Sequence, residues 1–69
     1  MSIGTVKWFN PVKGYGFIHP EDGSKDIFVH ITAVHRAGLK VLNEGQKVQF
    51  DIATSQDGKS AADNIALAD

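Results

Sequence analysis

Residues 13–18 read KGYGFI and residues 27–30 read IFVH. In each stretch flat side chains stand two positions apart, Tyr15 and Phe17 in the first and Phe28 and His30 in the second. Residues i and i+2 of a β-strand point to the same face. The link between the stretches is short and contains proline, aspartate and glycine, which favours a hairpin. Two paired strands would carry all four rings on one face, and we interpret that face as a platform for unpaired nucleic-acid bases.

Length and composition narrow the class of protein. The chain has 69 residues, a net charge of −1 and no cysteine, so we expect one small domain (residues 1–69) without disulfides or thiolate zinc sites. The charge argues against a polycation that coats phosphates. The longest apolar runs are too short to span a bilayer, and the first residues lack a secretion signal. We therefore expect a cytoplasmic monomer with no membrane partner.

Five stretches have the residue types or the alternation of β-strands. They are residues Ile3–Asn10, Tyr15–His19, Asp26–His30, Gln46–Ala53 and Ser60–Leu67. The long connection over residues 32–45 shows no alternation and predicts at most one helical turn, near residues 32–35. Without a helix that could cover an open sheet, closure hides the apolar face and removes the edges. The sequence thus predicts an all-β fold, a five-stranded antiparallel barrel.

The inner face of this barrel follows from the alternation. The predicted core consists of Val6, Ile18, Ile27, Val29, Val48, Phe50, Ile52 and Ile65. We also expect Leu39, Val41 and Leu42 to tuck under the long connection as lids on this core.

Two aromatic residues of the first strand do not follow the alternation. Strict alternation groups Trp8 with Val6, away from Lys7 and Phe9. Trp8 therefore either packs partly in the core or is turned outward by a β-bulge or by strand twist. For Phe9, stacking on a ligand and packing against the core are equally expected.

Other residues could contact the phosphates or extend the platform. The lysines expected near phosphates are Lys7, Lys13, Lys25 and Lys59. His19 would extend the platform beyond Phe17, while Asp26 and its acidic neighbours at the rim would repel phosphate. Gly14 and Gly16 would let a sugar–phosphate backbone pass close by. Three histidines on separate elements make a poor metal site, so we expect neither a metal nor another cofactor.

These residues resemble a known family. The stretches 13–18 and 27–30 resemble the first and second ribonucleoprotein motifs, and with GTVKWFN at residues 4–10 they are similar to the bacterial cold-shock proteins. The resemblance runs essentially from end to end. It implies a five-stranded oligonucleotide-binding (OB) barrel that binds single-stranded RNA and DNA, acts as an RNA chaperone and modulates transcription or translation. The family's binding positions correspond here to Lys7, Trp8, Phe9, Lys13, Tyr15, Phe17, Phe28 and His30.

The chain departs from the family pattern at two positions. The family often has an aromatic residue directly after the histidine of the second motif, where this chain has Ile31, and another in the long connection, where it has Leu39. Both departures remove a stacking partner, which predicts a shorter or weaker footprint at that end.

Three other classes of protein compete with this interpretation. An RNA-recognition motif requires the two motifs in reverse order and two amphipathic helices, which excludes it. A protein-binding small barrel could use the same aromatic face to grip a proline-rich or extended peptide. An enzyme is not expected, because no nucleophile–base pair, catalytic carboxylate pair or phosphate loop is discernible, and a nuclease that uses His30 has no further support.

Overall fold

The computed structural model of the chain describes residues 2–54, 58 and 60–68. Its elements are β1 (Ser2–Asn10), β2 (Tyr15–Pro20), β3 (Ile27–His30), α1 (Ile31–Arg36), β4 (Lys47–Thr54) and β5 (Ser60–Leu67). All five predicted strands are confirmed, and each end lies within one residue of the predicted one.

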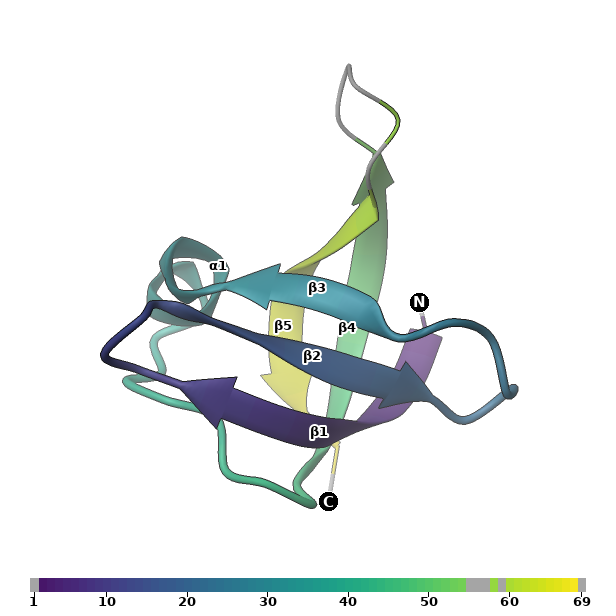
Figure 1. Ribbon diagram of the computed structural model, residues 1–69, viewed down its shortest axis with the longest axis horizontal. Helices are drawn as coiled ribbons and strands as arrows, with labels where there is room; N and C mark the ends of the chain where they lie inside the picture. Colours follow the sequence, from purple (N-terminus) through teal and green to yellow (C-terminus); the bar gives the residue numbers. More distant parts are fainter. Residues whose placement is uncertain (1, 55–57, 59, 69) are drawn as a thin grey trace.

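The strands form a closed barrel in the order β1-β2-β3-β5-β4 (Figure 1). The pairs β1–β2, β2–β3, β1–β4 and β4–β5 are antiparallel. The pair that closes the barrel, β3–β5, is parallel and places Phe28 opposite Ala61. The prediction of an all-β, five-stranded OB-type barrel is confirmed, and its antiparallel character holds for every pair except the closing one. That pair is joined through α1 and β4 rather than by a hairpin, so the chain is not required to reverse there.

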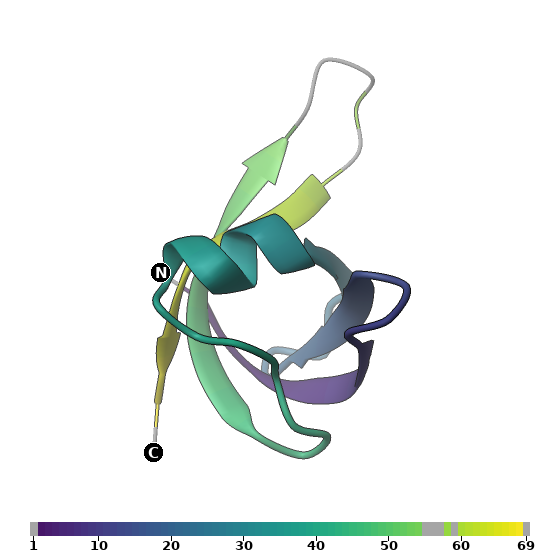
Figure 2. The same cartoon turned by 90° about the vertical axis from the view of Figure 1, so that its left-hand side faces the viewer.

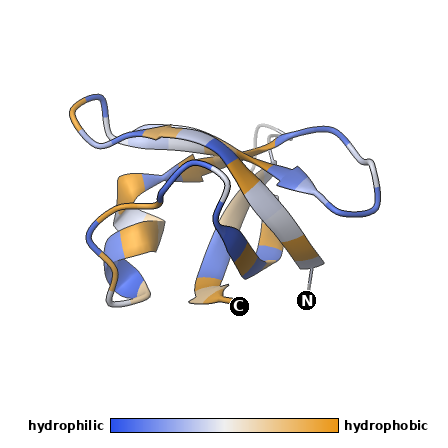
Figure 3. Ribbon diagram, turned by 90° about the horizontal axis from the view of Figure 1, so that it is seen from below, coloured by the Kyte–Doolittle hydropathy of each residue, from blue (hydrophilic) through white to orange (hydrophobic). Residues whose placement is uncertain are grey.

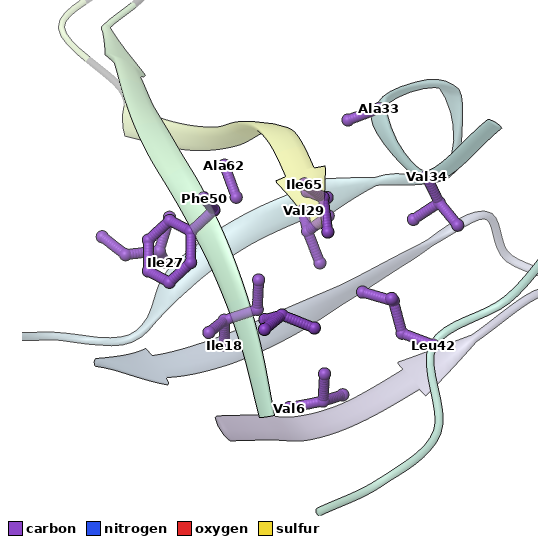
Figure 4. Packing of buried hydrophobic residues seen from close by; sticks show 11 residues of the cluster. Val6, Ile18, Ile27, Val29, Ala33, Val34, Leu42, Phe50, Ala62 and Ile65 are labelled. Carbon is purple, nitrogen blue, oxygen red and sulfur yellow. The ribbon is translucent and has the colours of Figure 1, made fainter. Parts of the chain in front are cut away.

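The core fills the space that the strands enclose. Hydrophobic and hydrophilic segments follow one another along the strands (Figure 3), as expected where one face is buried. Seven of the eight predicted core residues are buried, and Figure 4 shows Val6, Ile18 and Phe50 directed into the common interior. The cluster also includes Ala33, Val34, Leu42 and Ala62, which were not in the predicted core.

The core prediction was wrong for Ile52, which is 49% exposed. Ile52 lies opposite the buried Ala62, so it is on the inner side of the sheet. However, β1 pairs with β4 only as far as Phe50. The last residues of β4 and the first residues of β5 extend beyond the body of the barrel (Figure 1). Side chains on this projecting ribbon have no opposite wall to pack against.

The long connection begins with the predicted helical turn. α1 has six residues and lies across one end of the barrel (Figure 2), where its buried Ala33 and Val34 join the core. Of the three expected lid residues, Leu42 is buried and Leu39 packs partly against the core. The prediction for Val41 was wrong, because its side chain remains 40% exposed.

Candidate nucleic-acid interface

Five rings form a continuous cluster on the outer face of β1, β2 and β3, which we call the aromatic face. The Trp8 ring centroid lies 5.5 Å from that of Tyr15 and 5.4 Å from that of Phe17. Phe28 continues the cluster, 5.8 Å from Tyr15 and 5.9 Å from Phe17, and His30 lies 6.3 Å beyond it. These distances are typical of interacting aromatic pairs, so each ring holds its neighbours in place.

The register of β2 and β3 explains how four of these rings meet. Tyr15 lies opposite His30, and Phe17 lies opposite Phe28. Directly opposed residues of an antiparallel pair project to the same side of the sheet. The predicted shared face of Tyr15, Phe17, Phe28 and His30 is therefore present in the structure.

Trp8 reaches the aromatic face through a β-bulge. Val6 lies opposite Ile18, whereas Trp8 lies opposite Phe17, so Lys7 is the extra residue in β1. An extra residue shifts the alternation by one position and turns the following side chains to the other face. Of the two alternatives that the sequence left open for Trp8, the structure selects the bulge, and the indole is 36% exposed.

The same shift sends Phe9 inward. Phe9 lies opposite the buried Gly16, and its ring packs partly against the core. Phe9 therefore borders the core and lies off the aromatic face. The structure thus shows Phe9 packing partly against the core, and its contact with a ligand stays a prediction.

Gly16 is required by the fold. A Cβ atom at this position would come within 2.4 Å of the Trp8 carbonyl oxygen and 2.7 Å of the Phe9 Cα. Gly14 has a φ of +84°, and a Cβ there would come within 3.3 Å of the Ile31 Cγ2. β1 and Ile31 of the chain itself lie on the side where a Cβ would be, so the fold gives its own reason for these glycines. The passage of a sugar–phosphate backbone beside them stays a prediction.

Beside the aromatic face, Asp26 joins Lys7 and His19. One Asp26 carboxylate oxygen accepts a hydrogen bond from the Lys7 ammonium at 2.9 Å, and the other lies 3.0 Å from His19 Nδ1. The hydrogen bond with Lys7 and then that with His19 lower the pKa of the Asp26 carboxyl. Asp26 thus engages both Lys7 and His19, and its carboxylate offsets the positive charge of Lys7.

Lys13 lies at the opposite end of β2, in the exposed turn that leads into it. Asn10 Oδ1 accepts hydrogen bonds from the backbone N–H groups of Val12 and Lys13, at 3.0 and 3.1 Å. No ion pair of Lys13 is found among the described residues. The contact of Lys13 with a phosphate stays a prediction. The predicted contact Lys59 lies outside the described residues.

Comparison with known proteins identifies the family of this barrel. A family model described as the 'Cold-shock' DNA-binding domain matches residues 2–67. The chain belongs to the cold-shock domain family. Cold shock protein CspA of Rhizobium meliloti (strain 1021) is 58% identical over 69 residues, which cover 99% of this chain and 100% of that protein. Cold shock-like protein CspE of Escherichia coli (strain K12) is 59% identical over 64 residues, which cover 93% of each chain.

Family membership makes the chain a nucleic-acid-binding protein and not an enzyme. None of the helices in the described part of the chain is long and apolar enough to cross a membrane. Within the same residues no group of three or more histidine and carboxylate side chains is placed to hold a metal ion.

The two departures from the family pattern differ in their surroundings. Ile31 begins α1, and its backbone N–H donates to the Gly14 carbonyl at 2.9 Å, which brings it next to the turn before Tyr15. Leu39 lies in the connection after α1 and is partly committed to the core. An aromatic side chain at position 31 would therefore lie nearer the aromatic face of this cold-shock domain than one at position 39.

Two structural features of the site were not predicted from the sequence. Asp26 was interpreted only as a rim charge, although a hairpin register that pairs Ile18 with Ile27 extends to His19 opposite Asp26. The contact between His30 and Thr32 was also missed, because a cap on so short a helix leaves no periodic signal.

Proposed function

We propose that this cold-shock domain binds single-stranded RNA and DNA on the aromatic face and acts in the cytoplasm as a monomeric RNA chaperone. By opening weak base-paired structure it would modulate transcription or translation. The observation that carries the proposal is the unbroken cluster of five rings on one outer face of the barrel. Every base has a π-face, so a row of rings can accept bases of any sequence.

The rings can supply most of the affinity. Stacking of one base on an aromatic side chain contributes about 1–3 kcal/mol, as measured by truncation. Micromolar binding requires about −8 kcal/mol after the cost of ordering the strand. Three or four good stacks approach this value, which is consistent with a chain whose net charge is −1.

Charge has a secondary role in this proposal. The candidate phosphate contacts are Lys7, Lys13, Lys25 and Lys59, and Asp26 already engages Lys7. Two or three neutralised phosphates predict a salt slope near −2 for a single strand, at about −0.7 per phosphate.

The proposed chaperone activity needs no nucleotide hydrolysis. A protein at one hundred times its dissociation constant shifts an unfolding equilibrium by about 2.7 kcal/mol. At roughly 1.4 kcal/mol per stacked base-pair step, one bound protein offsets about two steps. The protein would therefore open weak hairpins and leave long duplexes closed.

A hairpin-opening assay tests this function. Two RNA hairpins with a fluorophore and a quencher at their ends would share one loop and differ in stem length. We expect the protein to open the short stem and not the long one, and a Phe17→Ala, Phe28→Ala double variant to open neither. Binding of single strands without opening of the short hairpin would reject the chaperone role. Binding of a proline-rich peptide in place of single strands would favour the peptide-binding alternative.

A further inference from the structure

His30 has two hydrogen-bonding nitrogens, and only one of them is engaged within the described residues. Its Nδ1 lies 3.0 Å from the Thr32 hydroxyl oxygen and 3.3 Å from the Thr32 backbone nitrogen. His30 is the N-cap residue of α1, with extended backbone angles, and its side chain accepts a hydrogen bond from the Thr32 N–H. The ring is thus tied by one edge to the first turn of the helix.

These contacts determine where the imidazole proton resides. A backbone N–H can only donate, so Nδ1 must present a lone pair to it. A neutral imidazole that accepts at Nδ1 carries its proton at Nε2. Nδ1 has one lone pair, so the Thr32 hydroxyl, which rotates freely, shares it with the backbone N–H in a three-centre hydrogen bond.

We propose that Thr32 is a positioning residue that holds His30 as the Nε2–H tautomer, so that the aromatic face ends in a directed hydrogen-bond donor. His30 is exposed, its ring is tilted by 34° relative to Phe28, and Nε2 has no hydrogen-bond partner in the described part of the chain. An N–H group at this position pairs with an oxygen acceptor of the strand, either a base carbonyl or a phosphate. This inference deepens the proposed function and rests on it.

The tautomer gives His30 a role that stacking alone does not explain. A ring that only stacked would tolerate any orientation about its own normal. Here the cap fixes that orientation, because Nδ1 must face Thr32 for both hydrogen bonds to form. The strand would therefore meet a donor at a fixed place at the end of the Tyr15–Phe28–His30 row of rings.

The first test needs no ligand. Nitrogen-15 NMR of the imidazole in the intact protein at neutral pH distinguishes a protonated from an unprotonated ring nitrogen. We expect wild-type His30 to be unprotonated at Nδ1 and protonated at Nε2. A proton on Nδ1 in the wild type would overturn the proposal, whatever the outcome of any binding experiment.

The second test uses a substitution of matched size and a control that keeps the hydroxyl but lacks the methyl group. Thr32→Val keeps the shape and removes the hydroxyl, and Thr32→Ser restores the hydroxyl. Thr32→Val keeps the backbone N–H that sets the tautomer, so we expect His30 to remain the Nε2–H tautomer, its ring to be held less firmly, and oligothymidine to bind about two- to tenfold more weakly, the range of one neutral hydrogen bond. Thr32→Ser should match the wild type in both measurements. If Thr32→Val leaves the dissociation constant unchanged, the Thr32 hydroxyl does not position the ring.

Two further arms separate the remaining outcomes. An oligothymidine with methylphosphonate linkages keeps its base carbonyls and loses its phosphate charges. If the Thr32→Val effect keeps its full size on it, the acceptor is a base carbonyl. If the effect shrinks, the acceptor is a phosphate, because the remaining uncharged phosphonate oxygen is a weaker acceptor than a charged one. A wild type with the expected tautomer that binds no oligothymidine would reject the proposed function but not the tautomer. A wild type that binds with a proton on Nδ1 would reject only the tautomer.

Discussion

Substitution of Gly16 by alanine tests whether the fold or a bound strand requires glycine at this position, because the first alternative predicts a loss of stability and the second a loss of binding. An added Cβ would come within 2.4 Å of the Trp8 carbonyl oxygen and 2.7 Å of the Phe9 Cα. Both atoms belong to the backbone of β1, so no side-chain rotation relieves the overlap. Overpacking of this kind typically costs about 1–3 kcal/mol, and we expect the upper end because β1 itself must move.

The size of this effect is large for so small a protein. A stability of about 0.05–0.15 kcal/mol per residue gives roughly 3–10 kcal/mol for this chain. A loss of about 3 kcal/mol lowers the melting temperature by roughly 12–24 °C, at about 4–8 °C per kcal/mol. Thermal unfolding followed by circular dichroism, supported by urea unfolding, measures both quantities.

The control for this prediction is Gly38→Ala. Gly38 has a φ of +82° and no neighbouring atom within 4 Å of an added Cβ, so only its left-handed backbone opposes the change, at about 1–2 kcal/mol. The Gly16 backbone has no such φ, and without the overlap Gly16→Ala would stabilise the fold by about 0.4–1 kcal/mol. A Gly16→Ala protein as stable as the wild type, but with weakened strand binding, would refute the reasoning and restore the ligand-based explanation.

Three further predictions follow from the site. Phe28→Ala should weaken single-strand binding more than Lys13→Ala at high salt, because salt does not screen stacking, and the opposite ranking in a salt titration would mean that charge dominates. The lowered pKa of Asp26 means that its contribution to stability is present above its ordinary pKa of 3.8 and is lost as the pH falls through the lower folded-state value. The Asp26→Asn variant should therefore lose less stability on acidification than the wild type. Urea unfolding from neutral pH to below about 4 measures this loss. Equal losses in the two proteins would mean that the pairs of Asp26 with Lys7 and His19 do not contribute to stability. Ile31→Phe and Leu39→Phe should each tighten binding in a fluorescence titration, Ile31→Phe more so, and unchanged dissociation constants for both would show that the strand does not reach that end.

The parts of the site that could be predicted from sequence are those that depend on strand alternation alone. Phe17 and Ile18 belong to opposite faces of β2 whatever the rest of the chain does, because successive side chains of a strand alternate. The same is true of Phe28 between Ile27 and Val29. The residues between these aromatic positions point into the barrel, so strand alternation also predicted most of the core.

The parts that could not be predicted depend on contacts between elements. The β-bulge at Lys7 exists because of how β1 pairs with β2, and it reverses the expected directions of Trp8 and Phe9. The exposure of Ile52 depends on where β1 stops covering β4. The burial of Val34 depends on where the six-residue helix α1 packs against the barrel, and so short a helix shows no hydrophobic periodicity in the sequence. In each case the pairing or packing of a neighbouring element decided the outcome.

The central claim is that the aromatic face binds single strands mainly by stacking. The most direct measurement is the titration of Trp8 fluorescence with an oligothymidine in low salt, for the wild type and for Phe17→Ala. We predict saturable quenching in the wild type with a dissociation constant of about 1 μM or lower, and a loss of about tenfold in Phe17→Ala, which corresponds to about 1.4 kcal/mol. Absence of quenching up to tens of micromolar with a folded protein, or equal affinity of the two proteins, would contradict the claim.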